Sequence, residues 1–264
     1  MPYQTKVQKK LGRREKRYEI ERLMRDKRSE DYEVLEEVFD RSTLMNIYHF
    51  LNDGTIDEIH GAVAAGKESK LYWGKDKDGN GLAIKIFLMV SAEFKRGMIP
   101  YIEGDRRFAK VKKDTRSLVF AWAQKEFNNL KQAYIAGVKV PKPIAVRQNV
   151  LVMEFIGENG VSAPLLREAY LKNPRQTYQQ LLVNLRKLYR KAGLVHADLS
   201  EYNVMIWKNQ PVLFDVSQSV LLEHPMADQY LRRDLSNINY YFKRLTVEVY
   251  SAEETYMRVT GVKV

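Results

Sequence analysis

The sequence contains no cysteine, and only four of its 264 residues are histidine. The lack of cysteine excludes disulfides, thiolate nucleophiles and cysteine-built zinc sites, and the few scattered histidines argue against a histidine-rich metal centre. No apolar run reaches the roughly 18–20 residues that a membrane span requires, and the opening MPYQTKVQKK lacks the apolar stretch of a secretory signal. We therefore expect a cytoplasmic protein with no membrane partner.

Material for a packed core is plentiful. Hydrophobic residues make up 45% of the chain, with 10 Phe, 16 Tyr and 3 Trp, so wholesale disorder is excluded. Neither internal repeats nor low-complexity tracts interrupt the sequence. The length allows one large domain or two small ones.

Positive charge is concentrated in two segments of the sequence. The formal net charge is +11, and residues 1–28 carry 11 Lys and Arg against four acids, whereas residues 91–116 carry eight against four. The rest of the chain is balanced. Such a concentration is typical of a polyanion-binding surface, and the sparse apolar residues of the first segment favour RNA over a membrane. A solvated helix face remains the alternative for residues 1–28.

The spacing of apolar residues predicts a strand-rich half followed by a helical half, and therefore two lobes with a cleft between them. The segment 91–113 is basic and interrupted by glycine, and we predict a long loop there. Strands are predicted at residues 59–64, 71–74, 82–88, 144–147, 150–155, 204–207 and 212–214. Helices are predicted at residues 31–51, 117–136, 163–171, 177–191, 227–246 and 251–259, the last with Ser251 and Glu254 as a capping box.

The strongest chemical signal is the segment His196-Ala-Asp198-Leu-Ser-Glu-Tyr-Asn203, followed by Phe214-Asp215 after a short strand. A carboxylate and a carboxamide five residues apart on a tight loop can face one point. A second carboxylate at the end of a neighbouring strand would complete an oxygen site for Mg²⁺. This order resembles the catalytic loop and metal-binding aspartate of protein kinases. A chance occurrence of such short motifs is the alternative, but the strand and loop context argues against it.

A second signal is Lys85, which stands alone among apolar residues in the predicted strand Leu82-Ala-Ile-Lys85-Ile-Phe. Kinases aim such a lysine at the α- and β-phosphates of ATP. The role requires an acidic partner on a helix, and Glu126, in a largely apolar helical segment, is the candidate. The alternatives are a lysine that extends into solvent and an exposed helical glutamate.

The segment Gly61-Ala-Val-Ala-Ala-Gly66-Lys67-Glu68-Ser69 nearly matches a P-loop, but Glu68 occupies the position of the metal-binding hydroxyl. The residues that follow are predicted to form a strand, whereas a P-loop requires a helix N-terminus there. We therefore interpret the segment as a strand–turn–strand flap. In this flap Lys67 and Ser69 would approach phosphates from above.

The predicted strand that ends at Glu154 precedes a glycine connector between the lobes. We expect backbone groups of Glu154 and Ile156 to face an adenine edge. The slot for the ring would be lined by Val63, Ala83, Met153 and Ile206. Because backbone groups would recognise the adenine, the side chains at these positions say little about the ligand, and this sequence signal is weakly specific.

In order along the chain, GAVAAGKESKLYWG, AIKIF, WAQKEFNNL, VLVMEFIG, LVHADLSEYNVMIW and VLFDVSQSV resemble the RIO family of atypical serine/threonine protein kinases. The resemblance covers roughly residues 40–246. The chain departs from ordinary protein kinases as that family does: the flap is GKES, Ala197 replaces the catalytic-loop arginine, and Val216-Ser217 replace Phe-Gly. Residues 1–60 are not the winged helix of the second type, so the chain is more similar to the type-one branch, in an archaeal form.

The resemblance implies an α+β, two-lobed protein-kinase-like fold with an N-terminal helical extension. The implied divisions are a basic arm and helical extension over residues 1–58, an N-lobe over 59–156 with a flexible basic insert at 91–116, and a reduced C-lobe over 157–264. This C-lobe would lack the activation segment and peptide-docking subdomains of ordinary kinases.

The resemblance also implies an activity: phosphorylation that depends on ATP and Mg²⁺, with Mn²⁺ as a substitute, including autophosphorylation and ATPase turnover. It further implies a role in maturation of the small ribosomal subunit, with the pre-ribosomal particle and its rRNA bound through residues 1–28 and 91–116. The autophosphorylated residue is open, with Ser91, Thr115 and Ser117 as candidates. The protein substrate is unknown.

The site roles carried over from the family fall on residues that match its motifs. Asp198 is the implied catalytic base, and Asn203 and Asp215 are the implied metal ligands. The implied nucleotide-binding residues are Lys67 and Ser69 over the phosphates, Lys85 paired with Glu126, and Met153, Glu154 and Ile156 at the adenine. Transient phosphorylation of Asp215 would make the protein an ATPase switch.

Two other functions are compatible with parts of the sequence. A small-molecule phosphotransferase of the aminoglycoside or choline kinase type shares the HxDxxxxN chemistry, but the basic insert would repel cationic substrates. A non-catalytic RNA-binding protein switched by nucleotide would fit the basic arm. The complete set of Lys85, Asp198, Asn203 and Asp215 argues against an inactive site.

Overall fold

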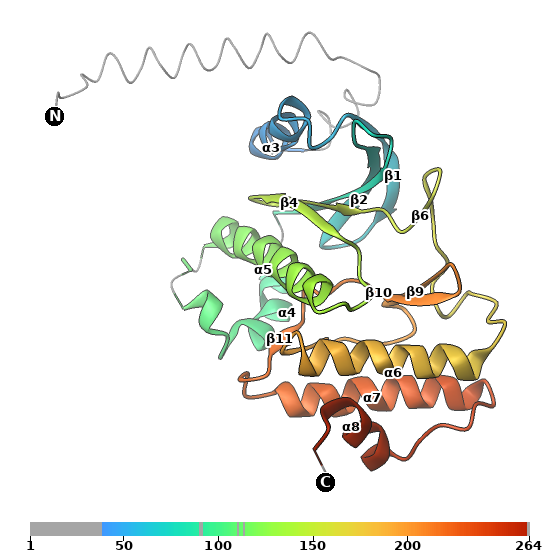
Figure 1. Ribbon diagram of the computed structural model, residues 1–264. Coiled ribbons are helices and arrows are strands. Elements are labelled where there is room, and N and C mark those ends of the chain that lie inside the picture. Colours follow the sequence, from blue (N-terminus) through green and yellow to red (C-terminus); the bar gives the residue numbers. More distant parts are fainter. Residues whose placement is uncertain (1–38, 90–91, 110, 113, 263–264) are drawn as a thin grey trace, which may run out of the picture.

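The computed structural model describes residues 39–89, 92–109, 111–112 and 114–262. Its elements form the two predicted lobes, a strand-rich upper lobe and a helical lower lobe (Figure 1). The observed arrangement is α+β and kinase-like, as the sequence predicts. In the described part of the chain, no helix is both long enough and apolar enough to cross a bilayer.

One antiparallel sheet forms the upper lobe. Its strands lie in the order β1-β2-β3-β5-β4. In chain order they are β1 (Glu58–Ala65), β2 (Ser69–Lys75), β3 (Gly81–Phe87), β4 (Pro143–Arg147) and β5 (Val150–Glu154). Successive side chains of a strand point to opposite faces of the sheet. Because β3 and β5 are central, both of their faces are buried.

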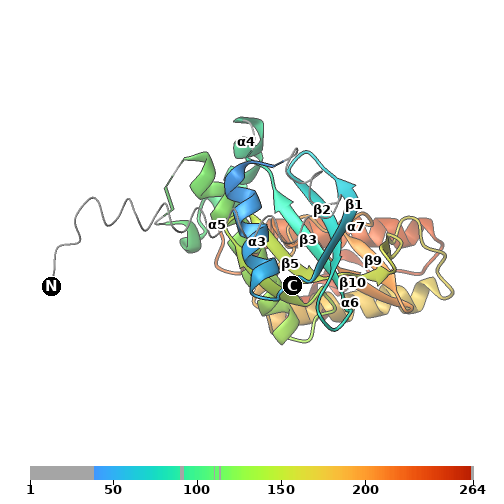
Figure 2. The same ribbon diagram turned by 90° about the horizontal axis from the view of Figure 1, so that it is seen from above.

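Alternation along β3 decides what each face contacts. Leu82, Ile84 and Ile86 share a core with the helix α3 (Arg41–Asn52), whereas Ala83 and Phe87 join the core below. Figure 2 shows α3 lying across the sheet. The predicted helix 31–51 is confirmed over residues 41–51, whereas Phe39 and Asp40 lie outside the helix, with Asp40 as its N-cap. Its first residues, 31–38, lie outside the described residues.

Helix α5 (Thr115–Ile135) covers the lower face of the sheet. Its buried residues recur at helical spacing, so one stripe of the helix faces the interior. The Asp114 side chain accepts the Ser117 N–H at 2.9 Å and caps the first turn. The predicted helix 117–136 is confirmed.

The prediction of a long loop at 91–113 is wrong in part. The segment contains the helix α4 (Ala92–Ile102) and a 3₁₀ turn, η1 (Arg106–Phe108). Pro100 lies inside α4, and in the sequence it argues against a helix there, because proline removes a backbone donor. The buried side chains of Met98 and Phe108 hold the segment in the core, and Tyr101 packs beside Trp122 and Tyr230.

Three long helices form the lower lobe: α6 (Pro174–Arg190), α7 (Ala227–Arg244) and α8 (Ala252–Thr260). The short strands of this half are β6 (Gly157–Glu158), β7 (Val161–Ser162), β8 (Leu194–Val195), β9 (Val204–Trp207), β10 (Gln210–Leu213) and β11 (Val220–Leu221). The Ser251 hydroxyl accepts the Glu254 N–H at 3.1 Å, as the predicted capping box requires, while the Glu254 carboxylate pairs with Arg258 at 2.8 Å.

The predicted helix at 163–171 is absent. Residues 163–171 form turns and a single bridge, in which Leu165 pairs with Met205 of β9. The Leu166 N–H donates to the Val204 carbonyl at 2.7 Å, and the Ile206 N–H donates to the Pro164 carbonyl at 2.9 Å. These bonds to β9 take the place of helical ones.

Candidate active site

An ion-pair cluster connects the two lobes. The Lys85 ammonium lies 2.9 and 2.8 Å from the two carboxylate oxygens of Glu126 and 2.9 Å from Oδ1 of Asp215. The predicted pairing of Lys85 with Glu126 is therefore present. Strand β3 and helix α5 belong to the upper part of the site, and Asp215 follows β10 of the lower lobe, so one lysine joins three segments.

The local folding of each segment explains this convergence. Lys85 lies on the same face of β3 as the buried Ala83 and Phe87, so its side chain points from the sheet toward α5. Glu126 lies in the buried stripe of α5 and is 1% exposed. Burial raises the pKa of Glu126 against the opposing effect of Lys85. Burial would lower the pKa of Lys85, but Asp215 and Glu126 together raise it, so the amine stays charged.

Asp215 is held by two donors. Lys85 and the Ser217 hydroxyl, the latter at 3.1 Å, both donate to Oδ1. Burial would raise the pKa of Asp215, but these two donors hold it below its usual value. The residue has a φ of 54°, an uncommon backbone conformation for a residue other than glycine, and such strain gathers at functional sites.

The loop that follows β8 brings Asp198 and Asn203 together. The Asn203 side-chain amide donates to the Asp198 carbonyl at 2.6 Å and to its carboxylate at 3.2 Å. The Phe214 N–H donates to the Asn203 carbonyl at 3.2 Å, which places this loop beside the segment that carries Asp215. His196 is buried, which lowers its pKa, and its Nε2 lies 3.1 Å from the Phe214 carbonyl. Because a carbonyl only accepts, that nitrogen carries the proton.

Two further carboxylates are influenced by this cluster. Burial raises the pKa of Asp198, and the charge of Asp215 raises it further, while Asn203 and Arg233 oppose the rise. Glu68 of the flap also has a raised pKa, through burial and then through the charges of Asp215 and Asp198. The negative charges of Asp215 and Asp198 in the lower lobe therefore raise the pKa of Glu68 in the flap.

Helix α7 supports the loop that carries Asp198 and Asn203, and the sequence did not lead us to expect this support. The Asp234 carboxylate accepts the N–H groups of Ala197 at 2.8 Å and Leu199 at 3.0 Å. Arg233 donates to the Ala197 carbonyl, and Asn237 donates to the Leu199 carbonyl at 3.1 Å. The sequence contained a signal for this support, because an acidic residue at 234 interrupts the apolar stripe of α7. In the structure Asp234 is 1% exposed, and a buried acid requires hydrogen-bond partners.

Helix α5 supports the Asp215 segment in the same way. The buried Asn129 amide donates to the carbonyls of Val216 at 2.8 Å and Ser219 at 3.1 Å, and the buried Lys125 donates to the Ser217 carbonyl at 2.6 Å. Asn129 in turn accepts a hydrogen bond from Arg107 at 2.7 Å. Polar residues in a buried helical stripe were again the signal that we overlooked.

The Arg107 contact ties the basic insert to the site. Asp105 holds the Arg107 guanidinium through bonds of 2.6 to 3.0 Å, and Arg107 contacts Asn129. The pKa of Asp105 is lowered by Arg107 although burial opposes this. The insert therefore packs against the residues that position the Asp215 segment, which sequence reasoning did not anticipate.

The flap has the predicted strand–turn–strand form. β1 ends at Ala65, and β2 begins at Ser69 and pairs with it in antiparallel fashion. Lys67 is exposed in the turn, and the Ser69 carbonyl accepts the Gly66 N–H at 2.9 Å. A strand rather than a helix follows Lys67, so the local structure is not that of a P-loop.

The strand predicted to face adenine is β5. Met153 is 9% exposed and lies opposite Ala83 of β3. The Glu154 N–H donates to the Lys142 carbonyl at 2.8 Å, but the Lys142 N–H donates to the Glu154 carboxylate at 3.0 Å. The N–H and C=O of one strand residue point to the same edge, so the Glu154 carbonyl points to the edge of β5 that faces Lys142. The Lys142 N–H does not bind this carbonyl, because it donates to the Glu154 side chain instead. Ile156, by contrast, accepts the Ala163 N–H at 2.9 Å.

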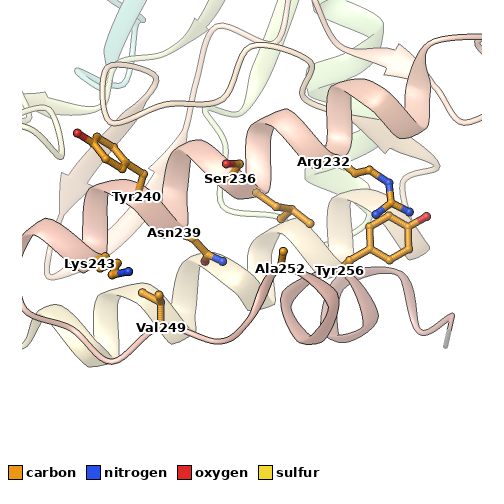
Figure 3. Close-up of a pocket in the computed structure, with 9 residues that line it drawn as sticks. Arg232, Ser236, Asn239, Tyr240, Lys243, Val249, Ala252 and Tyr256 are labelled. Carbon is orange, nitrogen blue, oxygen red and sulfur yellow. The ribbon is translucent and has the colours of Figure 1, made fainter. Parts of the chain in front are cut away.

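A separate hollow lies between α7 and α8 (Figure 3). It has a volume of 320 Å³ and contains none of the predicted site residues. Its lining consists of Arg232, Leu235, Ser236, Asn239, Tyr240, Lys243, Val249, Ala252 and Tyr256. The chemistry-bearing cluster of this protein is therefore between the lobes and not in this hollow.

The fold and this cluster define the class of protein: a two-lobed kinase-like fold with a lysine–glutamate pair, a catalytic-type loop and an aspartate after the next strand pair. The comparisons with known proteins agree. The family model described as "RIO domain" matches residues 70–255. The chain belongs to the RIO family of serine/threonine protein kinases.

The matches cover different shares of the relatives' sequences. The chain is 40% identical to the RIO-type serine/threonine-protein kinase Rio1 of Haloferax volcanii, over 96% of this chain and 86% of that one. It is 38% identical to the human serine/threonine-protein kinase RIO1, over 90% of this chain and 42% of that one. A crystal structure of the Rio2 kinase of Chaetomium thermophilum, in an ADP/Mg²⁺-phosphoaspartate complex, has a TM-score of 0.61 at 23% identity. The match covers 83% of this chain and 66% of that one, and it shows the shared fold.

Proposed function

We propose that the chain transfers the γ-phosphoryl group of ATP to a serine or threonine hydroxyl. The observation that carries this proposal is the convergence of Lys85, Asp198, Asn203 and Asp215, which come from three separate parts of the sequence. We also propose that residues 59–156 and 157–264 are the two lobes that enclose the nucleotide.

The donor set at Asn203 and Asp215 fits Mg²⁺. Asn203 uses its amide nitrogen on Asp198, which leaves its side-chain oxygen for another partner. Lys85 and Ser217 both donate to Oδ1 of Asp215, which leaves Oδ2. One or two protein oxygens together with phosphate oxygens are what Mg²⁺ usually takes in proteins. When bound there, the ion would neutralise charge on the phosphates.

The protein side chains have separate tasks in this reaction. Lys85 would orient the α- and β-phosphates, with Glu126 fixing its position. Asp198 would accept the proton of the attacking hydroxyl while the bond from that oxygen to the γ-phosphorus forms. The bond between the γ-phosphorus and the β–γ bridging oxygen breaks, and its electron pair leaves with ADP. The raised pKa of Asp198 brings it nearer to the working pH, as suits a proton acceptor.

The remaining predicted residues would bind the nucleotide around this centre. Lys67 and Ser69 of the flap are proposed to cover the phosphates, and Met153 to line the adenine slot. The Glu154 carbonyl is the proposed acceptor for the adenine amine, supported by its direction toward the edge of β5. Ile156 is proposed to donate its N–H to the ring.

Substitution of Asp198 tests the proposal. Asp198→Ala should leave ATP affinity within a few-fold of the wild type and reduce phosphoryl transfer by about 10²–10⁴-fold, because the proton acceptor is lost. Asp215→Ala should instead weaken Mg²⁺-dependent nucleotide binding. Glu223→Gln, on an exposed turn, is the matched control. Wild-type transfer by the Asp198 variant would refute the assignment.

A second candidate is ATP hydrolysis through a phosphoaspartate at Asp215. The observation that favours it is the uncovered Oδ2 of Asp215, and a Rio2 kinase of similar fold has been crystallised as a phosphoaspartate complex. Radiolabelled ATP followed by hydroxylamine separates the two products, because an acyl phosphate is cleaved and a phosphoserine is not. Label that resists hydroxylamine and maps to Thr115 or Ser117 would favour hydroxyl phosphorylation; Ser91 lies outside the described residues.

We also propose that the protein acts in maturation of the small ribosomal subunit and binds rRNA. The support is the positive charge of residues 1–28 and 91–116. Residues 1–28 lie outside the described residues. An RNA affinity that does not change with salt would contradict this partner, since phosphate contacts release counterions.

A further inference from the structure

Two stretches of the chain contain no acidic residue. Between Glu126 and Glu154 there are four Lys and Arg and no Asp or Glu, and between Glu168 and Asp198 there are six and again none. These stretches were hidden in the overall charge balance, because acids elsewhere offset them. Charge that is balanced along a chain can still be separated in space.

The fold places the two stretches side by side. The Lys187 ammonium donates to the Gly137 carbonyl at 2.9 Å, and the Lys139 N–H donates to the Asn184 side chain at 3.2 Å. Gln132 of α5 donates to the Ala192 carbonyl just beyond α6. Figure 1 shows the end of α5 above α6. The basic residues of both stretches therefore share one side of the molecule.

Helix α6 presents these charges outward. Its buried residues occupy one side, and its basic residues lie on the other, exposed except for the half-buried Lys187. We call the set the basic face. It consists of Lys131, Lys139, Arg186, Lys187, Arg190 and Lys191.

The described part of the basic face has no ion pair of the kind found on α7 and α8. Arg232 pairs with Asp228 on α7, and Arg258 pairs with Glu254 on α8, each at 2.8 Å. Among the described residues, no side chain of the basic face has an acidic partner within 4.0 Å. Neighbouring like charges repel one another, so an anionic partner would stabilise this arrangement.

A hollow of 600 Å³ borders the basic face where α5 ends. Its lining consists of Asn128, Lys131, Gln132, Ile135, Ala136 and Lys191. Ile135 is 74% exposed, and Tyr134 beside it is 45% exposed. Amide groups can bind the edge of an unstacked base, an apolar surface can contact its ring, and neighbouring cations can bind its phosphate.

We propose that the basic face and this hollow form a docking surface for single-stranded RNA. The cations would bind successive phosphates, and the hollow would accept a base. RNA is favoured over an acidic peptide because amide groups and an exposed apolar side chain line the same hollow as Lys131 and Lys191. Arg186 and Arg190 are one helical turn apart, about 6 Å along the axis, a spacing of the order of that between phosphates of one strand.

This inference rests on the RNA-binding part of the proposed function and is independent of phosphoryl transfer. The test measures binding of a fluorescein-labelled RNA of about 20 nucleotides to the full chain, by anisotropy, over a range of salt concentrations. The face variant replaces four exposed side chains by glutamine: Lys131, Lys139, Arg186 and Lys191. The control variant removes the same charge from other surfaces, at Lys77, Lys208, Lys243 and Arg244. Autophosphorylation of both variants should equal that of the wild type.

The face variant should flatten the slope of log K against log salt by about 2.8, at about 0.7 for each lost phosphate contact, which corresponds to a loss of affinity of about 10²–10³-fold near 0.1 M salt. The control variant should change neither quantity beyond a few-fold. Equal losses in both variants would overturn the inference, because they would show a diffuse charge effect. An unchanged face variant would also overturn it.

The outcomes for the docking surface and for the proposed function are distinguishable. A third variant, with glutamine at Lys9, Lys10, Arg13 and Arg14, tests the basic arm. If only this variant loses RNA, the rRNA partner survives and the docking surface is rejected. If the face variant loses affinity for polyglutamate or phosphatidylserine vesicles but keeps it for RNA, the docking surface is rejected as well. Loss of RNA binding in the face variant with intact autophosphorylation supports it.

Discussion

Removing the Lys85 ammonium should destabilise the protein more than removing its partner Glu126. Glu126 is 1% exposed, and Lys85 is the only cation within 4.0 Å of it among the described residues. Lys85, in contrast, has a second carboxylate, Asp215, at 2.9 Å. The pair is therefore asymmetric: Lys85→Met leaves a buried carboxylate without a partner, whereas Glu126→Met leaves a lysine that keeps one.

The magnitudes follow from that asymmetry. Breaking a buried pair from one side costs about 3–5 kcal/mol, so Lys85→Met should lower the free energy of unfolding by that amount and the melting temperature by roughly 10 °C. Glu126→Met loses hydrogen bonds to a charged donor, which are worth about 1.5–3 kcal/mol. Apolar replacement of both partners is often nearly neutral, so the double variant should lie within about 2 kcal/mol of the wild type.

Stability and activity should separate in this series. Urea unfolding followed by tryptophan fluorescence gives the free energies, and Trp122, which is 2% exposed, reports on the core beside the site. The double variant should regain stability but remain about 10²–10³-fold slower in phosphoryl transfer, since the charge that would meet the phosphates is gone. If Lys85→Met were no less stable than Glu126→Met, or if the two effects simply added, the electrostatic reasoning would be refuted.

Three other changes probe the support behind the site. Asp234→Asn should cost about 1–3 kcal/mol, because the two loop N–H groups bind different carboxylate oxygens and the amide places an NH₂ donor opposite one of them, and it should lower kcat while ATP affinity is kept; an unchanged kcat would contradict this. Asn129→Leu removes the side-chain donor from the Ser219 carbonyl and one of two donors from the Val216 carbonyl, which also accepts the Ser219 N–H. It should raise the Mg²⁺ concentration required for half-maximal activity, measured by titration against wild type. Burial lowers the pKa of Lys125 to about 7 from 10.5, so the unfolded chain binds more protons between pH 7 and 10.5 and the free energy of unfolding should rise across that window. Lys125→Met should flatten the rise, and parallel pH profiles would show the reasoning to be wrong.

Residues with a clear local period were predicted well from the sequence. Lys85 stood out as a lone lysine in an apolar strand and Glu126 as an acid in a largely apolar helix, and the kinase pattern joined the two as a pair. The order of Asp198, Asn203 and Asp215 along strands and loops was informative for the same reason. Such patterns survive in the sequence because each strand or helix determines its own periodicity.

The failures share one physical cause, which is tertiary contact overriding local preference. Pro100 argues against a helix in the sequence, whereas Met98 and Tyr101 pack α4 against the core. At 163–171 the apolar spacing suggests a helix, but backbone hydrogen bonds to β9 take its place. Neither outcome is written in the residues of the segment itself.

The supporting residues lie between these two cases. Asp234 and Asn129 are polar residues in otherwise buried helical stripes, and a buried polar group is costly unless it is hydrogen-bonded. The sequence therefore indicates that each must have a partner, but it cannot say which one, because Asp234 meets Ala197, and Asn129 meets Ser219, only in the folded chain. Their partners turn out to be the backbones of the two loops that carry Asp198 and Asp215. A polar residue inside an apolar helical stripe is thus a sign that the helix holds a loop in place, even where the chemistry occurs on the loop.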